Sequence, residues 1–435
     1  MSEGFDASGN PKKYIWFTTL YNARAYYPIL AILFLDLGLT LDQYVMLNLV
    51  WAATIFIFEV PSGALADVVG RRTLLVAASG LMVVEMGCLL FAPVDGGWIL
   101  FSMCVANRFF SGLSEATASG ADEALAYDSL PEKDRDAAWD GVLGSAMRYR
   151  SVGFVIAMII GGMLYDPSML NRALPDGMKL SEGLAHRLPV ALVFLQGLVC
   201  LGITLRMVEP VKVRNESVSQ SCRKAVALTL KTAKWVFTNP KTLSIVMVGL
   251  AIDSVVRNFA TITSSYYRLI ELPEWTFGFL GAAVGILGFA VPSIATRLNK
   301  RFSPLTNLGL IAGVVVLCLS GLVPANSYWC LIPGFMIMMT MGLMGFTISK
   351  ALHRESDSLQ RATVLSVKGL VFNLAYGAFS LGFSRLLTTF PDEPAGNALR
   401  QALLWQVPFF ALLVSVLIFW AKWMLADKDR RTSAG

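Results

Sequence analysis

Charged residues are scarce in this sequence. Asp, Glu, Lys and Arg together make up 15% of the 435 residues, whereas a soluble domain carries about 25%. Hydrophobic residues make up 55%. This composition excludes a water-soluble globular fold and predicts a protein embedded in a lipid bilayer.

Histidine and catalytic motifs are also lacking. The chain has only His186 and His353, so a histidine metal site is not expected. Its six cysteines lie mostly in apolar runs and show no metal-ligand or redox spacing. No phosphate-binding loop of the GxxxxGK[ST] type occurs, and no nucleophile–base set is found. We therefore predict no enzyme activity, no metal, no cofactor and no ATP hydrolysis.

Long apolar runs dominate what is present. We count twelve runs of about 20 residues each, which is enough for a helix to cross a bilayer. The expected fold class is an all-α integral membrane protein with twelve transmembrane helices. The predicted runs are 14–38, 43–66, 72–92, 97–121, 139–165, 187–208, 242–269, 275–297, 304–324, 327–350, 362–389 and 398–424.

Basic residues lie between these runs and gather in alternate loops, as Lys12, Lys13, Arg135 and Arg430 illustrate. Loops rich in Lys and Arg remain in the cytoplasm, so both termini are predicted to be cytoplasmic. The net charge of +6 then reflects these loops. Because the basic residues are scattered, no nucleic-acid partner is expected.

The connection 209–241 divides the chain into two predicted six-helix halves, 1–208 and 242–435. Its second part alternates apolar residues such as Leu228 with basic residues such as Lys231. That pattern predicts an amphipathic helix lying on the membrane surface. A solvated linker is the alternative.

The two halves resemble each other in sequence. FEVPSGALADVVGRR, from Phe58 to Arg72, is echoed by FAVPSIATRLNKR, from Phe289 to Arg301. The two segments are offset by roughly 230 residues, which indicates a parallel internal repeat of the kind found in many transporters. The second segment lacks the aspartate and the second glycine, so we expect it to form a weaker gate.

Six residues of the first segment follow the order G-x-L-x-D-x-x-G-R-R. This order resembles the signature loop of the major facilitator superfamily, a large family of secondary membrane transporters. We expect Gly63 to let two helices approach closely, Gly70 to permit a tight turn, and Asp67 to end a helix facing a neighbouring helix N-terminus. Val68 stands where the family usually has a basic residue. The six positions are Gly63, Leu65, Asp67, Gly70, Arg71 and Arg72.

The resemblance implies two six-helix bundles that rock about a central site, the alternating-access mechanism. It implies a monomer in the bacterial cytoplasmic (inner) membrane, with a small-molecule substrate, a coupling proton and the bilayer as partners. It also implies a cytoplasmic gate between the signature loop and the regions around Asp128 and Arg361. The expected gate residues are Glu59, Gly63, Asp67, Gly70, Arg71, Arg72, Asp128 and Arg361.

Ionisable residues inside the apolar runs are costly and need a reason. Arg24 lies ten residues into the first run, near the membrane midplane. The fourth run has polar residues three or four positions apart, which predicts one polar helix face. The residues of that face are Arg108, Ser111, Glu115, Ser119 and Asp122.

Asp253 and Arg257 in the seventh run are one turn apart and can pair within their helix. In the superfamily, the first, fourth, seventh and tenth helices line the central cavity, so we expect these charges on a substrate or proton path. The alternative is that they are structural ion pairs between helices. The expected path residues are Asn22, Arg24, Tyr26, Arg108, Glu115, Asp253, Arg257, Lys368 and Asn373.

Buried arginines outnumber buried carboxylates, which favours an anionic substrate, and a methionine-rich tenth run favours an apolar part. We therefore predict proton-coupled transport of an amphipathic organic anion, with Glu115 or Asp253 carrying the proton. A proton-coupled multidrug exporter is the first alternative. The fifth run keeps Gly161 and Gly162 of the family's antiporter motif, which also suggest close helix contact, but lacks its proline. A passive facilitator or a non-transporting membrane sensor is the second alternative.

Overall fold

The structure is a computed structural model that describes residues 9–132, 134–175, 178–210, 217–355 and 361–433. Every regular element in those ranges is an α-helix or a 3₁₀-helix. The all-α fold class is therefore confirmed. The elements as far as the linker are α1 (Asn10–Asn22), η1 (Tyr27–Ile29), α2 (Leu30–Asp36), α3 (Leu41–Val69), α4 (Arg71–Leu90), α5 (Gly97–Ala118), α6 (Ala121–Asp128), α7 (Arg135–Tyr165), α8 (Pro167–Ala173), α9 (Glu182–Ala185) and α10 (Leu188–Leu205).

The twelve predicted apolar runs all fall on helices. Among the described residues, ten helices are long and apolar enough to cross a membrane. The two other predicted runs correspond to α1 with α2, and to α5. The remaining elements are α11 (Val218–Thr238), α12 (Pro240–Leu269), α13 (Trp275–Leu287), η3 (Gly288–Ala290), α14 (Val291–Arg301), α15 (Pro304–Leu322), η4 (Tyr328–Cys330), α16 (Leu331–Glu355), α17 (Arg361–Thr388) and α18 (Asn397–Ser433).

The first run is broken in the middle, because α1 ends at Asn22 and helical structure resumes at Tyr27. Pro28 has no N–H to donate to the carbonyl of Arg24, four residues earlier. The Tyr27 N–H binds that carbonyl instead, at 3.1 Å. The Arg24 side chain donates from Nε to the carbonyl of Tyr21 at 3.2 Å, which satisfies an acceptor at the end of α1. Arg24 is therefore held at a helix break.

The fourth run also ends earlier than predicted. α5 stops before Ser119, and α6 begins after Gly120, whose φ of +73° is a left-handed conformation that favours glycine. The prediction that Ser119 and Asp122 continue the polar face of Arg108 and Glu115 is wrong, because this turn separates them from α5.

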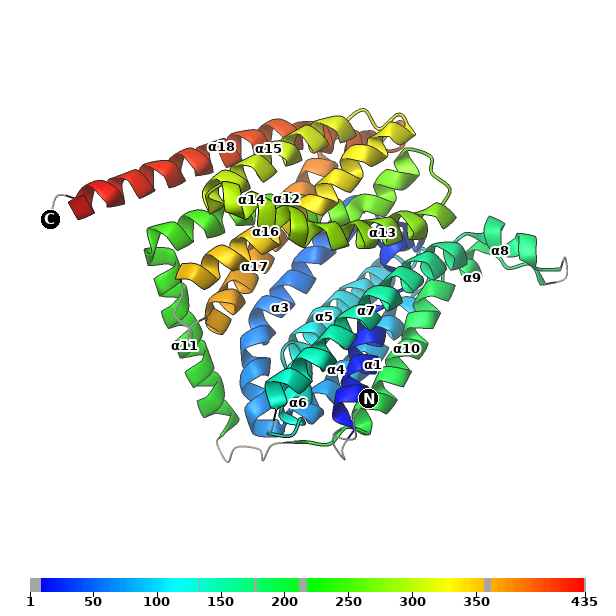
Figure 1. Ribbon diagram of the computed structural model, residues 1–435. Coiled ribbons are helices and arrows are strands. Elements are labelled where there is room, and N and C mark those ends of the chain that lie inside the picture. Colours follow the sequence, from blue (N-terminus) through cyan, green and yellow to red (C-terminus); the bar gives the residue numbers. More distant parts are fainter. Residues whose placement is uncertain (1–8, 133, 176–177, 211–216, 356–360, 434–435) are drawn as a thin grey trace. The chain divides into compact units, whose positions relative to one another are not determined.

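The chain folds into two compact units. In the first unit α4 packs against α5 and α10, and α1 packs against α7 and α10 (Figure 1). In the second unit α12 is central and contacts α15, α16, α17 and α18. The first unit comprises Met1–Thr40, Val50–Val226 and Leu272–Gly285, and the second comprises Leu41–Leu49, Ala227–Glu271 and Ile286–Gly435.

Three helices, α3, α11 and α13, are shared between these units. The beginning of α3 belongs to the second unit. There the Tyr44 hydroxyl donates to the carbonyl of Thr261 at 2.9 Å, and the Ser384 hydroxyl donates to the carbonyl of Asp42 at 2.9 Å. Most of α13 belongs to the first unit, where it packs against α7.

The contact between α7 and α13 depends on glycine. A Cβ atom added to Gly162 would lie 2.6 Å from the backbone nitrogen of Gly278. A Cβ atom added to Gly161 would collide with the carbonyl oxygen of Ala25. The close helix contact predicted from Gly161 and Gly162 is therefore confirmed.

Candidate functional site

A buried ion pair joins the broken first run to α4. Arg24 Nη1 lies 2.8 Å from Oε2 and 2.9 Å from Oε1 of Glu85. The two residues are 3% and 0% exposed. The Tyr26 hydroxyl lies 3.2 Å from Glu85 Oε1 and 3.3 Å from Arg24 Nη1. Asn107 on α5 donates to the backbone carbonyl of Glu85 at 2.8 Å. Glu85 and Arg24 thus neutralise each other inside a polar network.

Arg108 on α5 has a different environment. It is buried, and its guanidinium carbon lies 4.8 Å from the centre of the Phe34 ring. Its Nε and Nη2 atoms have no hydrogen-bond partner within the described part of the chain. A buried guanidinium with free donors is costly. Arg108 can therefore bind an acceptor that arrives from outside the protein.

Glu115 lies two helical turns after Arg108 on α5, on the same face. It is exposed, and no ion pair of its carboxylate is found in the described residues. Glu59 on α3 is partly buried, and it interacts electrostatically with Glu115. The Ser62 hydroxyl on α3 donates to the carbonyl of Ala116 at 2.6 Å, which holds the two helices together. The first unit thus presents two neighbouring carboxylates.

In the second unit, Asp253 and Arg257 form the predicted pair within α12. Arg257 Nη2 lies 2.6 Å from Asp253 Oδ2. Arg257 Nη1 donates to Asn373 Oδ1 on α17 at 2.7 Å, and its guanidinium lies 5.2 Å from the centre of the Tyr376 ring. Lys368 on α17 interacts electrostatically with Asp253. Four of the predicted path residues are therefore brought together here.

Two further residues complete these clusters. No spacing in the sequence links Glu85 to Arg24, although a lone acid in an apolar helix needs a partner. Tyr376 stacks on Arg257, and the Tyr376 hydroxyl lies 3.3 Å from the Thr261 hydroxyl.

By contrast, Asn22 turns back onto α1 and donates to the carbonyl of Thr18 at 2.7 Å. Asn22 is partly buried and contributes to neither charge cluster.

The signature loop forms an ion pair at the start of α4. Gly70 has a φ of +93°, so the tight turn predicted there is confirmed. Arg71 Nη1 pairs with Oδ2 of Asp128 at the end of α6, and it donates to the carbonyl of Ala124 at 2.8 Å. Both side chains of the pair are about three-quarters buried, at 21% and 24% exposed. The pair thus joins two of the residues expected at the gate.

The remaining residues expected at the gate have different surroundings from the Arg71–Asp128 pair, or have side chains outside the described part of the chain. Arg72 Nη2 donates to the carbonyl of Leu205, and its backbone N–H donates to Glu209, so this arginine fastens the end of α10. The close helix approach predicted at Gly63 is wrong for the described residues, because an added Cβ there would meet nothing within 4 Å. The side chains of Asp67 and Arg361 lie outside the described part of the chain.

Comparisons with known proteins agree with this architecture. The family model described as Major Facilitator Superfamily matches residues 15–380. The chain is 25% identical to the protein named Quinolone resistance protein NorA from Staphylococcus aureus (strain MSSA476), over 308 residues that cover 69% of this chain and 70% of that protein.

Solved structures share the fold at low sequence identity. A bacterial homologue of the human lysosomal transporter Spinster has a TM-score of 0.67 at 13% identity, covering 96% of this chain and 97% of that one. The nucleoside transporter NupG has a TM-score of 0.66 at 11% identity, covering 96% and 98%. A D-xylose–proton symporter has a TM-score of 0.63 at 11% identity, covering 96% and 95%. These likenesses concern the fold alone.

Proposed function

Because this chain belongs to the major facilitator superfamily, and is thus a multi-pass membrane transporter, we propose that it exports amphipathic organic cations in exchange for protons. Energy would come from the proton gradient across the cytoplasmic membrane. The two halves would alternate in exposing the substrate site to each side, as transporters with internal repeats do.

The exposed carboxylate of Glu115 is the observation that carries this proposal. It lies within a predicted membrane-crossing run and has no ion-pair partner in the described ranges. A carboxylate in that position is costly unless it binds a proton or a cation. Competition between a proton and an organic cation for one carboxylate is a simple way to exchange them. Glu59, close enough to interact with Glu115, adds to the attraction for a cation.

The arginines favour an anionic substrate less than their number suggests. Arg24 is neutralised by Glu85, and Arg257 is neutralised by Asp253. Each already has the carboxylate that a substrate would otherwise supply. The similarity to a protein named for quinolone resistance adds support for export of an organic compound.

Transport of an amphipathic organic anion is the second candidate. Arg108 favours it, because two of its nitrogen atoms have no acceptor among the described residues. Arg108 is only 6% exposed, however. An anion would have to displace neighbouring side chains to reach it. We therefore rank cation export first.

Transport by the purified protein in liposomes tests the proposal. A pH gradient should drive movement of tetraphenylphosphonium, a lipophilic cation, and taurocholate, an amphipathic anion, should be moved less. Glu115→Gln removes a charged partner worth about 1.5–3 kcal/mol, so cation binding should weaken about tenfold or more. Glu123→Gln, on the exposed side of α6, is the matched control and should transport normally.

Four results would contradict the proposal. Cation transport that is unchanged in Glu115→Gln would exclude this carboxylate from the path. Transport of taurocholate alone, lost in Arg108→Gln, would favour the organic-anion candidate. Flux that ignores the imposed pH gradient would indicate a passive facilitator, and no flux of any solute tested would favour a sensor.

A further inference from the structure

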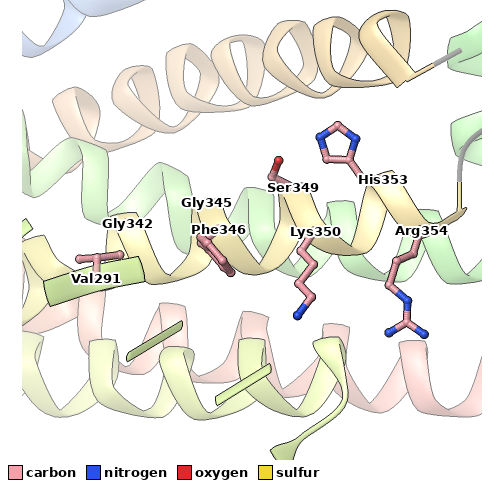
Figure 2. Close-up of a pocket in the computed structure, with 8 residues that line it drawn as sticks. All are labelled: Val291, Gly342, Gly345, Phe346, Ser349, Lys350, His353 and Arg354. Atoms are coloured by element: carbon pink, nitrogen blue, oxygen red, sulfur yellow. The ribbon is translucent and has the colours of Figure 1, made fainter. Parts of the chain in front are cut away.

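An open groove of about 850 Å³ lies between α14 and α16 in the second unit (Figure 2). It is separate from the charge clusters of α5 and α12, since none of their residues lines it. The lining residues are Val291, Gly342, Gly345, Phe346, Ser349, Lys350, His353 and Arg354.

One end of the groove is apolar. Val291 of α14 lies against Gly342 of α16, so closely that a Cβ added to Gly342 would be 3.0 Å from the Val291 side chain. One turn further on, a Cβ added to Gly345 would meet nothing within 4 Å. The helices therefore touch at Gly342 and leave space at Gly345, beside the ring of Phe346.

The other end of the groove is basic. Lys350 and Arg354 are one helical turn apart and point in the same direction in Figure 2, so one anion can contact both. His353 adds a third nitrogen-bearing side chain at this end. No ion pair of Lys350 or Arg354 with an acidic residue is found in the described ranges.

The helix dipole explains only part of this arrangement. Basic residues in the last turn of a helix favourably face its terminal carbonyl groups, which accounts for His353 and Arg354 at the end of α16. Lys350 lies a turn earlier, and two like charges one turn apart repel each other. A bound anion would remove that repulsion.

Apolar side chains that do not line the groove are exposed on the same two segments of the chain. Phe289 and Ile294 on the η3–α14 segment are 67% and 40% exposed, and Met341 on α16 is 37% exposed. Such side chains are suited to contact with hydrocarbon chains. The basic end of α16 lies on the side predicted to be cytoplasmic, where anionic lipids attract Lys and Arg.

We propose that this groove binds an anionic phospholipid. The phosphate is held by Lys350 and Arg354, and the first part of an acyl chain lies along Val291 and Phe346. Charge at one end and apolar walls at the other match the two parts of such a lipid. A soluble phosphate would use only the basic end.

Thermal unfolding of the delipidated protein in detergent tests this proposal. A ligand that binds the folded state raises the melting temperature. Phosphatidylglycerol should raise it more than phosphatidylcholine with the same acyl chains, and inorganic phosphate should not reproduce the difference. The Lys350→Gln/Arg354→Gln variant should lose the difference between the two lipids. Arg301→Gln, which does not line the groove, should keep it.

A second variant keeps the test decisive if the double variant folds poorly. Gly345→Leu should fill part of the open space, since a Cβ there meets nothing within 4 Å, and should weaken the response to phosphatidylglycerol. The proposal is overturned if both variants respond to phosphatidylglycerol as the wild type does. It is also overturned if inorganic phosphate stabilises the wild type as much as the lipid, since a soluble anion is then the ligand.

Discussion

Arg24 at the break in the first run and Glu85 on α4 form an ion pair with an Nη1–Oε2 distance of 2.8 Å, and both are almost fully buried. Pro28 causes the break that holds Arg24, and Glu85 supplies the charge that makes its burial tolerable. The sequence placed Arg24 on a substrate or proton path, with a structural ion pair between helices as the alternative, and the pair with Glu85 favours that alternative.

Removing one partner of this pair should destabilise the protein strongly. Arg24→Met or Glu85→Leu leaves an unpaired buried charge, which costs about 3–5 kcal/mol. The double variant should recover most of that loss, because no charge remains buried. Unfolding in detergent, analysed as a double-mutant cycle, measures the coupling. Single variants as stable as the wild type would contradict the pairing.

Breaking the ion pair of the signature loop should affect transport more than stability. Arg71 and Asp128 are partly exposed, and such pairs contribute about 0.2–1 kcal/mol. Asp128→Asn should therefore slow transport while the melting temperature and substrate affinity change little. Asp140→Asn, an exposed acid on α7, serves as the control. A large loss of affinity in Asp128→Asn with an unchanged rate would argue against a gate.

Asp122 on α6 should make stability depend on pH. Burial raises the pKa of its carboxyl group from 3.8 to about 6. The folded protein therefore binds this proton more tightly than the unfolded chain does, so stability falls as the pH rises from 3.8 to about 6. Asp122→Asn should stabilise the protein at pH 7.5, and this gain should shrink towards pH 4. Melting temperatures of both proteins across that range provide the measurement, and a gain independent of pH would contradict the shift.

The contact between α7 and α13 should not tolerate a side chain. Gly162→Val places atoms against the backbone of Gly278, and overpacking of this kind costs about 1–3 kcal/mol. Gly144→Ala is the matched control on α7, since a Cβ there meets nothing within 4 Å. That change should stabilise the helix by about 0.5–1 kcal/mol. Equal melting temperatures for the two variants would exclude the close approach.

The features predicted best from the sequence were contacts within one helix and the positions of the long apolar helices. Asp253 and Arg257 were paired from their four-residue spacing, and the structure confirms the pair. The twelve apolar runs likewise located the helices, because hydrocarbon requires long apolar segments. Such features depend on neighbours along the chain.

Contacts between distant segments were harder to predict. Glu85 is 61 residues from Arg24, and nothing in the spacing of two separate helices fixes which side chains will meet. The end of α5 was missed because its polar pattern continues through Gly120, although a glycine so placed permits a turn. Arg72 was assigned to the gate from the family motif, and that motif does not show that its side chain binds the carbonyl of Leu205, because adjacent residues on a helix point in different directions.

The two ion pairs of α4 have a mechanical consequence for the first unit. Arg71, at the start of the helix, is fastened to α6, and Glu85, fourteen residues later, is fastened to the segment after α1. At 1.5 Å per residue, the attachment points are roughly 21 Å apart along a continuous helix. A helix resists compression, so the distance between the two attachment points stays nearly constant. A displacement of Arg24 would therefore be transmitted along α4 to Asp128, which gives events in the membrane a direct route to the loop at its surface.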